Sequence, residues 1–194
     1  MTDQQNSTPS PARTPAADTG GFMHPERIIA KLEIKPGMVI ADFGAGGGYF
    51  TIPAARLAGE NGKVYAIDVQ KQTVSMIGSK ANLEHLLNVE TVWADLERPQ
   101  GSRLQAESVD AVIVANILFQ AEAKREVLAE AFRVAKSGGR LAILEWDETS
   151  FPAGPPPEKR MAKGLARRMA EGVGFKLEKE FEAGSHHYGL LFKK

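Results

Sequence analysis

Residues 39–51 read Val-Ile-Ala-Asp-Phe-Gly-Ala-Gly-Gly-Gly-Tyr-Phe-Thr. An apolar run leads directly into a segment with four glycines among five residues, and a helical pattern follows it. Glycine permits a tight turn and lets a ligand approach the backbone closely. Because open α/β sheets bind ligands beyond the carboxyl ends of their strands, this stretch predicts a strand, a ligand-binding loop and a helix.

Short β-rich runs alternate with helical patterns on the carboxyl side of this loop. Such alternation predicts an α/β fold, a Rossmann-like doubly wound and mostly parallel sheet covered on both faces, with right-handed crossovers. Near the end of the chain, two strands joined by the short link 182–187 can form only an antiparallel hairpin. The expected strands are 39–43, 64–67, 89–93, 109–114, 141–145, 175–181 and 188–192, and the expected helices are one beginning near Pro25 and those at 49–58, 71–87, 121–135 and 157–172.

The composition of the 194 residues is that of an ordinary globular domain, with 43% hydrophobic residues and a formal net charge of zero. Residues 1–20 contain no Val, Ile, Leu or aromatic side chain, which predicts a disordered tail before a single domain at 21–194. No apolar stretch approaches the roughly 20 residues that cross a bilayer, so no membrane association is expected. The absence of cysteine excludes disulfides and thiolate metal sites, fits a cytoplasmic protein, and leaves no metal site predicted.

The glycine-rich loop does not suit the phosphate-binding motifs. A P-loop needs Gly-Lys-Ser/Thr at the start of its helix, and this chain has Gly48-Tyr49-Phe50 there. The dinucleotide fingerprint would place its third glycine at Tyr49, which is too large for close packing of helix and strand. Asp42, two residues before the first glycine, suits a cationic ammonium or sulfonium better than a pyrophosphate. An NAD-dependent oxidoreductase is therefore disfavoured.

Polar residues stand at the ends of the following strands. Asp68 ends the second strand, where a carboxylate can accept hydrogen bonds from both hydroxyls of a ribose. Asp95 follows the third strand and could accept from an adenine amino group, and Asn116 follows the fourth. Each of the two aspartates could instead be an ordinary turn or capping residue. Four consecutive strand ends with polar residues nevertheless predict one shared binding crevice.

At this point the chain resembles the class I S-adenosylmethionine-dependent methyltransferases, and within them the small type-11 branch related to quinone-biosynthesis C-methyltransferases. The resemblance covers roughly residues 22–194 and rests on four segments. The family motif of an acidic residue followed by three alternating glycines matches Asp42, Gly44, Gly46 and Gly48 without a gap. The four segments are DFGAGGGYFT at 42–51, GKVYAIDV at 62–69, ADLE at 94–97 and SGGRLAILE at 137–145.

The resemblance implies S-adenosylmethionine as cofactor and a sheet order of 3-2-1-4-5-7-6. The loop Gly44–Gly48 would pack against the methionine part, Asp42 would help hold its ammonium group, and Asn116 would lie beside it. Asp68 would bind the ribose hydroxyls. The cofactor-binding residues that the resemblance implies are Asp42, Gly44, Ala45, Gly46, Gly48, Asp68, Val69 (against the adenine ring), Asp95 (to the adenine amino group), Leu96 (through its backbone amide) and Asn116.

The resemblance implies methyl transfer to an acceptor that the sequence does not identify. In-line displacement from a sulfonium needs mainly alignment, and a base only where the acceptor must lose a proton. Gln120, Trp146, His186 and His187 are expected near the acceptor, and Gln120 and the two histidines are the candidate catalytic residues. A His pair in an exposed hairpin is also simply solvated in many proteins.

Several alternatives stay open from the sequence. The acceptor could be a small molecule or a macromolecule. Arg160, Lys163 and Arg167 share a helical face that could meet RNA phosphate, although a solvated face is the simpler interpretation and nucleic acid is not otherwise indicated. The domain could also bind S-adenosylmethionine without catalysis, as a sensor or a partner subunit.

Overall fold

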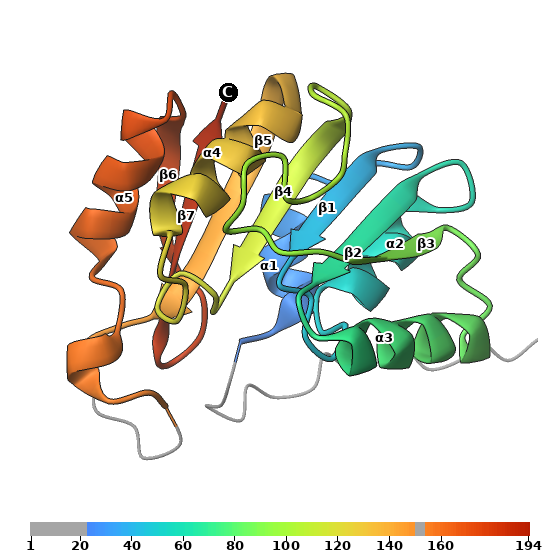
Figure 1. Ribbon diagram of the computed structural model, residues 1–194, viewed down its shortest axis with the longest axis horizontal. Coiled ribbons are helices and arrows are strands. Elements are labelled where there is room, and N and C mark those ends of the chain that lie inside the picture. Colours follow the sequence, from blue (N-terminus) through green and yellow to red (C-terminus); the bar gives the residue numbers. More distant parts are fainter. Residues whose placement is uncertain (1–22, 150–153) are drawn as a thin grey trace, which may run out of the picture.

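The computed structural model describes residues 23–149 and 154–194. A seven-stranded sheet has the order β3-β2-β1-β4-β5-β7-β6, which confirms the expected topology (Figure 1). Strands β1 to β5 pair in parallel, and β7 pairs antiparallel with both β5 and β6. The elements are α1 (Pro25–Lys31), β1 (Val39–Phe43), α2 (Thr51–Ala58), β2 (Lys63–Asp68), α3 (Lys71–Leu83), β3 (Val89–Trp93), β4 (Val109–Ala115), α4 (Lys124–Val134), β5 (Ala135–Trp146), the 3-10 turn η1 (Pro157–Lys159), α5 (Lys163–Gly172), β6 (Lys176–Glu182) and β7 (His187–Lys193).

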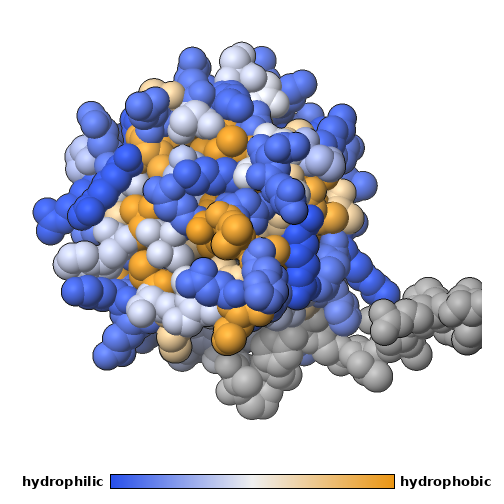
Figure 2. Space-filling view, turned by 90° about the vertical axis from the view of Figure 1, so that its right-hand side faces the viewer, coloured by the Kyte–Doolittle hydropathy of each residue, from blue (hydrophilic) through white to orange (hydrophobic). Residues whose placement is uncertain are grey.

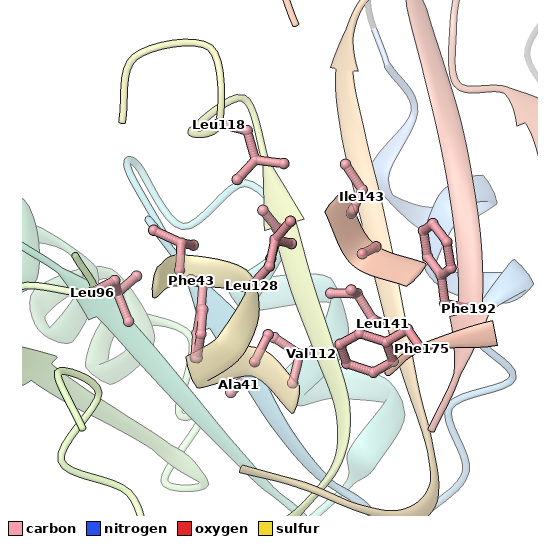
Figure 3. Packing of buried hydrophobic residues seen from close by; sticks show 14 of the residues in the cluster. Ala41, Phe43, Leu96, Val112, Leu118, Leu128, Leu141, Ile143, Phe175 and Phe192 are labelled. Carbon is pink, nitrogen blue, oxygen red and sulfur yellow. The ribbon is translucent and has the colours of Figure 1, made fainter. Parts of the chain in front are cut away.

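Successive residues of a central strand point to opposite faces of the sheet and so belong to two different hydrophobic cores. In β1, Ala41 and Phe43 belong to the core that also contains residues of α4 and α5, whereas Ile40 belongs to the core that contains residues of α1 and α2. Figure 3 shows the first core, where Leu128 of α4 lies over Phe43 and Val112. Because both faces of the central strands are buried, these strands read as continuous apolar runs in the sequence.

The predicted helix over residues 157–172 is interrupted, and this part of the prediction was wrong. Arg160, with φ −69° and ψ 149°, is extended, and Ala162, with φ −59° and ψ 132°, is also not helical, so the two residues separate η1 from α5. Between them Met161 is buried in the core under α5, and its carbonyl accepts a hydrogen bond from the Tyr188 hydroxyl at 2.7 Å. Tertiary packing of Met161 therefore overrides the helical pattern of the segment.

Helix α3 also ends earlier than the predicted residue 87. It stops at Leu83, and His85 has a positive φ of 56°. The Leu86 amide donates back to the Ala81 carbonyl, which closes the helix end. Figure 2 faces the side of the molecule with α3 and the outer strand β3, where apolar surface lies in patches between charged side chains.

The predictions of a disordered tail at 1–20 and of a domain boundary at residue 21 concern residues outside the described ranges. Among the helices of residues 23–149 and 154–194, none combines the length and the apolar character needed to span a bilayer.

Candidate functional site

A cavity of about 500 Å³ lies where the carboxyl ends of β1 to β4 meet. These strand ends point toward the lower side of Figure 1. Every one of the four strand ends singled out in the sequence contributes to it. Of the predicted cofactor-binding residues, Asp42, Ala45 and Gly48 do not line it. The lining residues are Gly44, Gly46, Asp68, Val69, Gln70, Thr73, Ala94, Asp95, Leu96, Glu97, Ala115, Asn116, Ile117, Gln120, Ala121 and Val127.

The glycine-rich loop is held compact by its own backbone. The amides of Gly44 and Ala45 both donate to the Ile67 carbonyl, at 2.8 and 3.0 Å. Gly44 and Gly46 have φ values of +69° and +51°, the left-handed region that favours glycine. A Cβ added at Gly46 would meet no heavy atom closer than 3.9 Å, so the wall at this point opens onto free space. The loop therefore presents bare backbone to the cavity.

Asp68 connects the glycine-rich loop to the start of α3. One carboxylate oxygen accepts from the Gly46 amide at 3.0 Å, and the other accepts from the Gln70 amide at 2.8 Å. The residue is 8% exposed. Because a carboxylate has about four acceptor positions, these two bonds leave capacity for a ligand. Asp68 thus both shapes the loop and offers acceptors at the cavity.

Asp95, which follows the third strand, both stabilises a turn and lines the cavity. The Asp95 oxygens accept from the Glu97 amide and from the Arg98 guanidinium, both at 3.0 Å, so the turn role considered for this residue is present. Val69 is 60% exposed, and the Trp93 indole fixes its carbonyl with a hydrogen bond of 2.9 Å. Val69 and Leu96 provide apolar surface beside the Asp95 carboxylate.

Asn116 stands at the fourth strand end in a backbone conformation unusual for a residue other than glycine. Its φ is +55°, and its amide donates to the Leu144 carbonyl at 2.8 Å. Its side-chain oxygen is buried and has no hydrogen-bond partner in the described part of the chain. Buried polar atoms are normally satisfied, so this oxygen is a free acceptor at the cavity. The Gln120 side chain donates to the Asn116 carbonyl at 3.0 Å and also lines the cavity.

Glu145 is a residue to which sequence reasoning gave no role. It is fully buried at the end of β5, and its Oε1 accepts from the Leu118 amide at 2.6 Å. This bond anchors the loop after β4 that carries Ile117 and Gln120. The signal in the sequence was a carboxylate closing the apolar run 141–144. Burial raises the pKa of Glu145 to about 7, against the opposing effect of the amide donors.

Asp42 is buried behind the loop. Its carboxylate accepts from the Thr51 hydroxyl at 2.6 Å, which ties β1 to the first residue of α2. Burial raises the pKa of Asp42 to about 6, with a smaller contribution from the nearby Asp68 charge. Any influence on a ligand must therefore act through the electric field or through Thr51 and the loop.

Replacing Glu145 by Gln should change how stability depends on pH. The raised pKa means that the folded state binds this proton more tightly than the unfolded state, whose value is about 4.3. The contribution of Glu145 is therefore fully present below that value and is lost as the pH rises toward 7. Denaturant unfolding from pH 4.5 to 7.5 should show the variant gaining about 1–3 kcal/mol relative to the wild type.

Glu60→Gln supplies the control for this measurement, because it removes the same carboxyl group from an exposed position. Parallel curves for wild type and Glu145→Gln would show that Glu145 does not keep its proton in the folded state.

The two histidines occupy different environments, and neither lines this cavity. His187 is the first residue of β7 and is buried, which corrects the expectation that both lie in an exposed hairpin. His186 lies half-buried with Nδ1 3.0 Å from the Thr149 hydroxyl. Burial lowers the pKa of His187 to about 4, so this imidazole is a poor base near neutrality.

The basic side chains that were considered for RNA binding, Arg160, Lys163 and Arg167, all have partners within the chain. Lys163 forms an ion pair with Glu180 at 3.0 Å, and Arg167 reaches Glu171 at 3.0 Å and Glu180 at 3.5 Å. Arg160 turns inward and donates to the carbonyls of Asp147 and Pro155. These pairs fit the interpretation as an ordinary protein surface.

Comparisons with known proteins agree on one family. A family model described as a methyltransferase domain matches residues 34–186. The chain is 31% identical over 127 residues to the ubiquinone/menaquinone biosynthesis C-methyltransferase of Bordetella parapertussis, covering 66% of this chain and 48% of that protein. The chain thus spans about half the length of the curated relatives it matches.

Two solved structures share the fold over nearly their full length. A SAM-dependent methyltransferase from Aquifex aeolicus is 30% identical with a TM-score of 0.82, covering 89% of this chain and 90% of that one. A structure from Sulfolobus solfataricus described as a type 11 methyltransferase is 27% identical with a TM-score of 0.73, covering 90% and 94%.

Proposed function

The chain belongs to the class I S-adenosylmethionine-dependent methyltransferases, in the type-11 branch, and from this premise we propose that it transfers the methyl group of S-adenosylmethionine to an acceptor. The observation that carries the proposal is the cavity at the four strand ends. Its charged lining residues are Asp68, Asp95 and Glu97, and none of the described Lys or Arg side chains lines it. Such a wall suits a cationic ligand and disfavours a pyrophosphate.

The residues present fit this cofactor. Asp68 would accept from the ribose hydroxyls, and Val69 would cover the adenine ring. Asp95 and the Leu96 amide would meet the adenine edge, although the Asp95 oxygens are already shared with the Glu97 amide and Arg98. The list of proposed contacts is completed at the methionine end by Gly44, Ala45, Gly46 and Gly48 along the loop, Asn116 through its unpartnered oxygen, and Asp42 from behind the loop.

Bound S-adenosylmethionine supplies a methyl group that is already activated by its positive sulfur. The task of the chain is then to align two partners, which contributes up to about 7–11 kcal/mol to lowering a barrier. The loop after β4 performs this alignment, because Glu145 fixes it and Gln120 is tied to Asn116. Of the three candidate catalytic residues, only Gln120 lines the cavity at the four strand ends. No specific observation favours the alternative that the chain binds the cofactor without catalysis. The cytoplasmic location stays a prediction.

Ligand titration tests the proposal directly. Calorimetry should show that S-adenosylhomocysteine, the demethylated product, binds at least tenfold more tightly than NAD or ATP, because the acidic wall disfavours their phosphates. Tight NAD binding without S-adenosylhomocysteine binding would overturn the proposed function.

A further inference from the structure

A second cavity, of about 910 Å³, lies at the same edge of the sheet, where β5 ends, β7 begins and the segment from Pro157 to Lys163 passes. Its deepest lining residues are buried: Trp146, Met161, His187 and Tyr188. The proposed methyl transfer assigns no role to this cavity.

His187 is the unusual member of this floor. It is 2% exposed, and neither ring nitrogen has a hydrogen-bond partner among residues 23–149 and 154–194. Its ring packs on the Trp146 ring with centroids 4.1 Å apart, which restricts its orientation. Two unsatisfied nitrogens in one buried side chain are costly, so both ring nitrogens are available to a group other than the described residues.

Three neighbouring polar side chains of this cavity are engaged with partners other than His187. The Tyr188 hydroxyl donates to the Met161 carbonyl, and the Arg160 guanidinium donates to backbone carbonyls. Lys163 pairs with Glu180. His187 is neutral near pH 7 because burial lowers its pKa to about 4, so one nitrogen donates and the other accepts.

The chemistry of the walls narrows the ligand class. The cavity is lined by four carboxylates, those of Asp147, Glu148, Glu180 and Glu182, against the two cations Arg160 and Lys163. An anionic ligand would meet this acidic excess unfavourably. A floor of aromatic and thioether side chains favours an apolar ring, with one polar group to satisfy the imidazole.

The two cavities flank the end of one strand. Glu145 anchors the loop that lines the first cavity, and Trp146, the next residue, lines the second. We infer that the second cavity binds a ligand whose core is a neutral planar ring carrying one hydrogen-bonding group, which His187 recognises. His187 is a specificity-determining residue here rather than a base.

Three naphthalene probes test this inference on the full chain. 2-Naphthol carries the hydrogen-bonding group, 2-methylnaphthalene replaces it by a methyl group of similar size, and 2-naphthoate replaces it by an anion. By saturation-transfer NMR titration, 2-naphthol should bind about tenfold more tightly than 2-methylnaphthalene, because the methyl probe leaves the imidazole unsatisfied. 2-Naphthoate should bind most weakly of the three.

His187→Phe should reduce the preference for 2-naphthol over 2-methylnaphthalene to within twofold, whereas the neighbouring His186→Phe should preserve it. In the wild type, 2-naphthol should also shift the imidazole NMR signals of His187, a readout that does not depend on the variant folding. Saturating S-adenosylhomocysteine should not displace 2-naphthol.

Equal binding of the three probes, an unchanged preference in His187→Phe, or unshifted His187 signals would each overturn the inference. Displacement of 2-naphthol by S-adenosylhomocysteine would also overturn it, because the probe would then occupy the first cavity. S-adenosylhomocysteine that binds while no probe does would contradict the inference alone, and S-adenosylhomocysteine that fails to bind would contradict the proposed function.

Discussion

Replacing Asp68 by Ala is expected to weaken S-adenosylhomocysteine binding by two orders of magnitude or more. The carboxylate is proposed to accept from both ribose hydroxyls, and hydrogen bonds to a charged group contribute about 1.5–3 kcal/mol each. Since 1.4 kcal/mol corresponds to a factor of ten, the two bonds account for a change of this size. The variant also removes the acceptor for the Gly46 amide, which loosens the loop that the ligand must meet. Calorimetric titration with S-adenosylhomocysteine measures the change.

Asp110 is the matched control for this experiment. It accepts from the Val39 amide at 2.8 Å and pairs with Lys136 at 2.7 Å, but it does not line the first cavity, at the ends of β1 to β4. Asp110→Ala should therefore lower the free energy of unfolding by about 1–3 kcal/mol with affinity retained. An Asp68→Ala protein that unfolds more easily yet binds S-adenosylhomocysteine normally would make Asp68 a purely structural link between Gly46 and Gln70.

The sheet could be predicted from the sequence because its strands are buried on both faces. Each central strand appears as an uninterrupted apolar run bounded by polar or glycine residues, and the short link at 182–187 restricts the last two strands to a hairpin. The sequence of β4, Val109–Ala115, illustrates this, since its single charged residue Asp110 lies near its amino end. Local pattern and tertiary environment agree in these elements.

The interrupted helix before α5 shows where such reasoning fails. Its apolar spacing is compatible with one continuous helix, but Met161 is buried by a strand close in space and distant along the chain. The burial of Glu145 and His187 likewise depends on tertiary contacts that the local sequence does not show. Both residues are polar and stand at strand ends, yet whether they are solvated depends on which loops fold over them. Sequence reasoning located the strand ends and could not supply these contacts.

The glycine-rich loop and the loop after β4 should pack against each other through Gly44 and Ile117, and Gly44→Ala tests this contact. A Cβ at Gly44 would lie 2.2 Å from Cγ2 of Ile117, and φ at this residue is +69°. Overpacking costs about 1–3 kcal/mol and a strained backbone conformation adds about 1–3. We therefore expect a loss of about 2–6 kcal/mol in the free energy of unfolding, with a marked loss of S-adenosylhomocysteine affinity. Denaturant unfolding and calorimetry give the two quantities.

Two comparisons separate the steric conflict from backbone strain. Gly37 has φ +88° and no heavy atom within 4 Å of an added Cβ, so Gly37→Ala should show strain alone, at about 1 kcal/mol. In an Ile117→Ala background the conflicting methyl group is gone, and Gly44→Ala should cost at least 1 kcal/mol less than it does beside Ile117. Equal costs for Gly44→Ala in the two backgrounds would mean that Ile117 moves aside freely. Coupling between the two substitutions would instead identify Gly44 and Ile117 as the contact through which the anchored loop after β4 positions the glycine-rich loop.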